Sequence, residues 1–127
     1  MKKRIAKYTF LLYLTLGVLL PQFGFSQFEI PKVPSKQTAL YDYANVLSSS
    51  EKEQLESKLV RYSDSTSTQI VVITIPDLKG EDIAVLATNW GQTWKIGQKN
   101  EDNGIVILVK PTGNTGERKL FIDRKST

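Results

Sequence analysis

The sequence predicts an α/β domain in which helices pack against a small mixed β-sheet. Two strongly apolar segments, at 69–75 and 104–109, have the composition of buried strands. A segment with apolar residues at helical spacing precedes each of them, at 49–63 and at 80–96. Because helices and strands alternate along the chain, we expect a layered fold with helices against the sheet.

The first 26 residues have the layout of a secretory signal peptide. A basic stretch at 1–8 precedes an apolar run at 9–20, which is shorter than the roughly 20 residues that a membrane-spanning helix needs. Small residues at Gly24 and Ser26 predict cleavage before Gln27. We therefore expect an exported protein, periplasmic or extracellular, with membrane association as the alternative if the segment is retained.

The net charge of +4 comes from this N-terminal segment. Four of the 17 basic residues precede the first acidic residue, Glu29, which leaves 13 basic and 13 acidic residues in the remainder. Such a neutral chain has no basic surface for nucleic acid, and we exclude that class of partner. The chain has no Cys and no His, which excludes disulfides, thiol nucleophiles and the usual zinc sites.

The first elements of the exported chain are a leader and a helix. The leader at 27–40 contains two prolines and is expected to be extended, either along the surface or as a spacer between the membrane and the domain at 41–127. The helix at 49–63 has two possible starts, because Ser48 with Glu51 and Ser50 with Glu53 both have capping-box spacing.

The later elements complete the predicted sheet. Pro76 ends the strand at 69–75, and the helix at 80–96 has Trp90 and Trp94 on its apolar stripe, where we expect core residues. Turn-forming residues at 111–116 separate the strand at 104–109 from an alternating strand at 118–123, which should pair antiparallel with it. Three strands leave an open edge, so either a partner covers it or the sequence lacks elements of the fold.

Four segments in this order resemble the TPM domain family, named for a thylakoid-lumen phosphatase-like protein, a photosystem II repair factor and a nematode acetylcholine-receptor modulator. They are YDYANVL at 41–47, QIVV at 69–72, WKIG at 94–97 and DNGIVILV at 102–109. The resemblance implies an α/β/α-type sandwich, placement outside the cytoplasm and, in some members, divalent cation binding. Members usually continue past the last strand with a Gly-Tyr-Gly-Leu-Glu-like segment, so we expect C-terminal elements to be missing and the domain to be incomplete.

The candidate metal site combines Asp42 with Glu101, Asp102 and Asn103. Asp42 precedes the first predicted helix and the other three precede a buried strand, so both stretches are expected on loops at one edge of the sheet. Their carboxylate and amide oxygens suit Ca²⁺ or Mg²⁺. The alternative is structural, because Asp-Asn-Gly is common turn chemistry and Asp42 can bind local amides.

These observations lead to one functional hypothesis and two alternatives. We expect an exported accessory module that binds Ca²⁺ or Mg²⁺ and assists envelope or membrane proteins. The first alternative is a metal-dependent acid phosphatase acting on phosphomonoesters, an activity that has been attributed to a plant member of the family. The second is an inactive truncated fragment. The sequence assigns no catalytic residue and no substrate.

Overall fold

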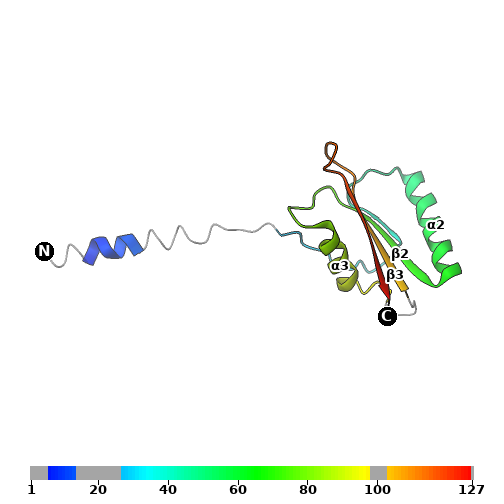
Figure 1. Cartoon of the computed structure of the whole chain (residues 1–127), viewed down its shortest axis with the longest axis horizontal. Helices are drawn as coiled ribbons and strands as arrows, with labels where there is room; N and C mark the ends of the chain where they lie inside the picture. Colours follow the sequence, from blue (N-terminus) through cyan, green and yellow to red (C-terminus); the bar gives the residue numbers. More distant parts are fainter. Residues whose placement is uncertain (1–5, 14–26, 98–102, 127) are drawn as a thin grey trace.

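The computed structural model describes residues 6–13, 27–97 and 103–126, and the rest of the predicted signal peptide lies outside these ranges. Residues 6–13 form a short helix that precedes the domain (Figure 1). The elements of the domain, in chain order, are β1 (Leu40–Asp42), α2 (Ser49–Thr66), β2 (Thr68–Thr74), α3 (Ile83–Thr93), β3 (Asn103–Lys110) and β4 (Lys119–Ser126). In the described part of the chain, no helix has the length and apolar character needed to cross a membrane.

The four strands form one mixed sheet in the order β1-β2-β3-β4. β1, β2 and β3 run parallel, and β4 pairs antiparallel with β3 as the sequence predicts. The two helices lie on opposite sides of the sheet, so the predicted α/β/α layering is confirmed (Figure 1). The prediction of three strands was wrong because β1 has three residues and too little alternation to be recognised.

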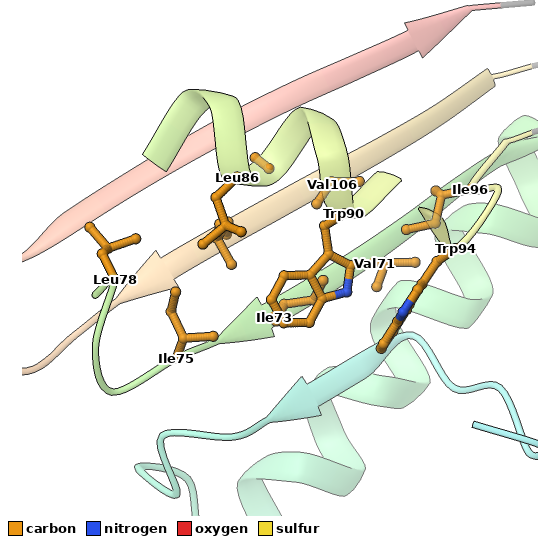
Figure 2. Packing of buried hydrophobic residues seen from close by; sticks show 11 residues of the cluster. Val71, Ile73, Ile75, Leu78, Leu86, Trp90, Trp94, Ile96 and Val106 are labelled. Carbon is orange, nitrogen blue, oxygen red and sulfur yellow. The ribbon is translucent and has the colours of Figure 1, made fainter. Parts of the chain in front are cut away.

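The core lies between the sheet and α3, on the side that we call the α3 face. Val71 and Ile73 of β2 lie beside Val106 and Leu108 of β3 on this face, and all four are buried. Trp90, which has 0 % exposure, projects from α3 onto these strands (Figure 2). The prediction that Trp90 and Trp94 are core residues is therefore confirmed.

The leader contributes to the same core. Its residues 27–39 have no helix or strand, as predicted, but they pack against the domain and do not extend away from it. The ring of Phe28 lies 5.5 Å from that of Trp90 between centroids, and the indole N–H of Trp94 donates to the Pro31 carbonyl at 2.7 Å. The leader thus closes the core beside α3.

On the opposite side, which we call the α2 face, the helix covers only part of the sheet. α2 packs on β1 and β2, and within the described residues none of its Cα atoms lies within 8 Å of a Cα atom of β3 or β4. The capping box that starts α2 is the pair Ser48 and Glu51, whose side chains each accept the backbone N–H of the other residue. In the part of the chain that the structure describes, no helix therefore packs over the apolar α2 face of β3 and β4.

Candidate functional site

The carboxylate of Asp42 organises the loop between β1 and α2. It ends β1, and its side chain is only 2 % exposed although it is ionisable. One oxygen, Oδ1, accepts the Thr74 hydroxyl at 2.6 Å and the Val46 N–H at 3.2 Å. The other, Oδ2, accepts the Leu47 N–H at 2.9 Å and lies 3.9 Å from the Lys52 ammonium. Both oxygens are therefore engaged by the protein itself.

These contacts decide the ionisation state of Asp42. Burial raises the pKa of the carboxyl group, but the Thr74 hydroxyl, the Leu47 and Val46 amides and the Lys52 charge all lower it. The groups that lower the pKa of Asp42 together outweigh the effect of burial, so this pKa lies below its ordinary value. Asp42 is consequently a carboxylate at neutral pH, as its four contacts require.

Aromatic rings hold the same loop against the core. Tyr41 contacts Trp94 edge to face, with ring centroids 4.7 Å apart, and the centroid of Tyr43 lies 6.1 Å from that of Trp90. Burial, followed by the neighbouring Tyr41, raises the pKa of Tyr43. Because both rings contact core residues, they position the Asp42 loop on the body of the domain.

The register of the sheet places Asp42 and Asn103 at opposite ends. Asp42 pairs with Thr74, at the carboxyl end of β2, whereas Asn103 pairs with Thr68, at the amino end of β2. Thr68 and Thr74 are six residue steps apart along β2, which corresponds to roughly 20 Å at 3.3 Å per residue. Glu101 and Asp102 lie outside the described residues. The expectation that Asp42 and Asn103 meet at one edge is therefore wrong.

The physical reason is the orientation of β1. The sequence prediction placed Asp42 on a loop before a helix and did not recognise that it ends a strand. Because β1 runs parallel to β2 and β3, its last residue lies with their carboxyl ends, while Asn103 begins β3. The proposed four-ligand set does not fit this arrangement. Among the residues that the structure describes, no group of three or more His, Cys, Asp or Glu side chains could hold a metal ion.

At the amino end of the sheet, two glycines bring the flanks of segment 98–102 together. A Cβ atom built on Gly97 would lie 2.6 Å from the Gly104 nitrogen, so the two backbones are in direct contact. The Gly97 N–H donates to the side-chain oxygen of Gln69 at 2.8 Å. No signal in the sequence indicates that each of these glycines provides room for the other.

A cavity of about 590 Å³ opens at this same end. Its wall includes Gln69 and Ile70 of β2, Trp94 and Lys95 after α3, and Val33 of the leader. A second cavity of about 450 Å³ lies beside β1 and includes Asp42 in its wall. Asp42 and Gln69 thus belong to two separate places on the domain.

Comparison with known proteins identifies one family. The TPM domain matches residues 40–126, which include every strand and both helices of the layered domain. No curated protein matches the chain. The match agrees with the resemblance that the sequence segments carry, and with the mixed sheet between two helices.

Proposed function

Because the chain belongs to the TPM domain family, we propose that it is an exported accessory module that binds and assists other proteins of the cell envelope. The observation that supports binding is the apolar α2 face of β3 and β4, over which no helix of the described residues packs. Leu120 and Ile122 on that face are 60 % and 57 % exposed. Large apolar side chains gathered on one exposed surface are typical of sites where another protein binds.

The engagement of Asp42 favours this function over catalysis at that residue. Its carboxylate would have to give up the Thr74 hydroxyl or the two loop amides before it could act as a nucleophile or a metal ligand. Each hydrogen bond to a charged group is worth about 1.5–3 kcal/mol. Asp42 is therefore better explained as the residue that holds the β1–α2 loop.

Support for export comes from the sequence. The basic and apolar segments at 1–20, followed by Gly24 and Ser26, have the order of a secretory signal. Phe28, the second residue after the predicted cleavage position, already contacts the core. A chain processed at this position would keep Phe28, Ile30 and Val33, which pack against the core.

The test uses the full-length chain in its native cell, with a photoreactive residue replacing Leu120. We expect a processed chain that begins at Gln27, fractionates outside the cytoplasm and forms light-dependent cross-links to envelope proteins. Val85, an equally exposed apolar residue on α3, is the matched control position and should give few cross-links. An unprocessed cytoplasmic chain would contradict export, and equal cross-linking from both positions would contradict binding through β4.

We further propose that Ca²⁺ or Mg²⁺ binds through Glu101, Asp102 and Asn103, without Asp42. The support is the sequence of three oxygen-bearing side chains, which suits a hard cation. Titrating the ¹⁵N-labelled chain with Ca²⁺ should shift the amide signals of 101–104 and leave that of Asp42 in place. Asp102→Asn should abolish the shifts, whereas the matched change Asp64→Asn on α2 should not. Shifts centred on Asp42, or none at 101–104, would disprove the proposal.

A further inference from the structure

The leader begins beside the turn that precedes α3. The ring of Phe28 lies 5.5 Å from that of Trp90, and the Phe28 backbone N–H donates to the Glu81 carboxylate at 3.1 Å. Ile30 and Val33 continue along the same core. The second residue of the predicted exported chain is therefore held in place by a carboxylate that lies 53 positions further along the sequence.

The Glu81 carboxylate has one oxygen to spare. Its Oε1 accepts the Phe28 N–H, while no hydrogen bond between described residues reaches Oε2 and no described Lys or Arg forms an ion pair with the group. The neighbouring Asp82 is already engaged, since its carboxylate accepts two backbone N–H groups at the start of α3. The side chain of Glu81 is partly buried, so it places a negative charge that nothing balances beside the first residues of the leader.

Cleavage before Gln27 would change the charge at this place. In the unprocessed chain the Gln27 nitrogen belongs to a neutral peptide bond with Ser26. In the processed chain the same nitrogen is a terminal ammonium, which is protonated at neutral pH. Nitrogens of consecutive residues lie at most about 3.6 Å apart, so this ammonium lies within about 7 Å of the Glu81 oxygen that accepts from Phe28.

Cleavage also gives the Gln27 nitrogen freedom to move. Gln27 is exposed, and once nothing precedes it, rotation about its Cα–C bond carries the ammonium toward the Glu81 carboxylate. The same rotation in the unprocessed chain would have to move all the preceding residues. Because Phe28 occupies Oε1, the ammonium can bind Oε2 with no loss of an existing contact. A hydrogen bond between two charged groups is stronger than one between neutral groups.

We propose that removal of the signal peptide creates an ion pair between the terminal ammonium of Gln27 and the carboxylate of Glu81. The ion pair fixes the start of the leader, and with it Phe28, over the core beside α3. The domain then reaches its full stability only after processing. This inference rests on the proposed function in one respect, since export supplies the cleavage that makes Gln27 the first residue.

The test uses the full-length chain with a factor Xa recognition sequence in place of residues 23–26, so that the protease leaves Gln27 first. Thermal unfolding is followed by circular dichroism before and after cleavage, in the same non-ionic detergent. Cleavage should raise the Tm by about 3 °C. Glu81→Gln should remove this rise, because the amide still accepts the Phe28 N–H but carries no charge. The matched change Glu53→Gln, at an exposed position of α2, should preserve it.

A second measurement neutralises the ammonium itself. Glutaminyl cyclase joins the terminal nitrogen of Gln27 to the carbon of its own side-chain amide, and the side-chain nitrogen leaves as ammonium. The resulting lactam has no charge, so this treatment should reverse the rise in Tm of the cleaved wild type. In the cleaved Glu81→Gln variant, the same treatment should leave the Tm unchanged.

Two results would overturn the inference. An equal rise in Tm for the wild type and Glu81→Gln would show that the gain comes from losing the signal segment and not from the ion pair. No rise in the wild type would show that the ion pair does not form. Both results concern the cleaved chain alone, whereas an unprocessed chain in cells would contradict export, so failure of the inference is distinguishable from failure of the proposed function.

Discussion

Replacing Asp42 with alanine should lower the free energy of unfolding by about 3 kcal/mol at pH 7. The change removes the carboxylate that accepts from the Thr74 hydroxyl and from the Val46 and Leu47 amides. Thr74 is buried, so its hydroxyl would lose its acceptor in a place that water does not easily reach. Urea unfolding followed by circular dichroism measures the difference.

The loss should depend on pH in a defined direction. The folded pKa of Asp42 lies below its ordinary value of 3.8. A carboxyl group with a lowered pKa stabilises the fold fully above its unfolded pKa, and this stabilisation disappears as the pH falls through the folded value. The difference between the wild type and Asp42→Ala should therefore shrink below about pH 4.

Asp64→Ala is the matched control for this prediction. Asp64 is exposed in the last turn of α2, and its removal should change the free energy of unfolding by less than about 0.5 kcal/mol. A deficit for Asp42→Ala that stays constant down to pH 2 would contradict the proposed role of the carboxylate charge. In that case the loss would come from packing of the side chain alone.

Gly97→Ala should also lower the free energy of unfolding by about 3 kcal/mol, for a different reason. Gly97 has a φ of 79°, a conformation that is unfavourable for alanine. The added methyl group would in addition lie 2.6 Å from the Gly104 nitrogen and 2.7 Å from its Cα atom. Since both contacts are backbone atoms of a strand, relief requires the turn that contains Gly97 to move away from β3.

Gly80→Ala separates the two contributions. Gly80 has almost the same φ, 78°, but a methyl group there would meet nothing within 4 Å. Gly80→Ala should therefore lower the free energy of unfolding only through its unfavourable backbone conformation, by about 1 kcal/mol. Thermal unfolding of both variants gives the comparison. Equal destabilisation would show that the contact between Gly97 and Gly104 contributes nothing to stability.

The prediction from sequence succeeded where the signal is local. The apolar runs at 69–75 and 104–109 are buried strands, and the stripe containing Trp90 and Trp94 packs in the core. Ser48 and Glu51 cap α2, because a hydroxyl and a carboxylate three residues apart satisfy helix-start amides wherever the helix lies. Each of these features depends on neighbours within a few residues.

The candidate site failed because it depended on pairing between distant segments. Asp42 and Asn103 were expected to share an edge, but the parallel register of β1, β2 and β3 puts them at opposite ends of the sheet. β1 has only three residues, and what makes it a strand is its pairing with β2. Nothing within three residues of sequence specifies that pairing or its direction.

The sequence by itself determined the class of fold, the core-forming segments and the family, because hydrophobic periodicity and caps act over short distances. Tertiary structure alone decided that the Asp42 carboxylate is held by Thr74, that Gly97 lies against Gly104, and that α2 leaves β4 uncovered. Asp42 and Thr74 are 32 positions apart in the sequence, and Gly97 and Gly104 are 7 positions apart. The third feature depends on where α2 packs on the sheet. They arise from strand register and layer packing, which are properties of the assembled chain.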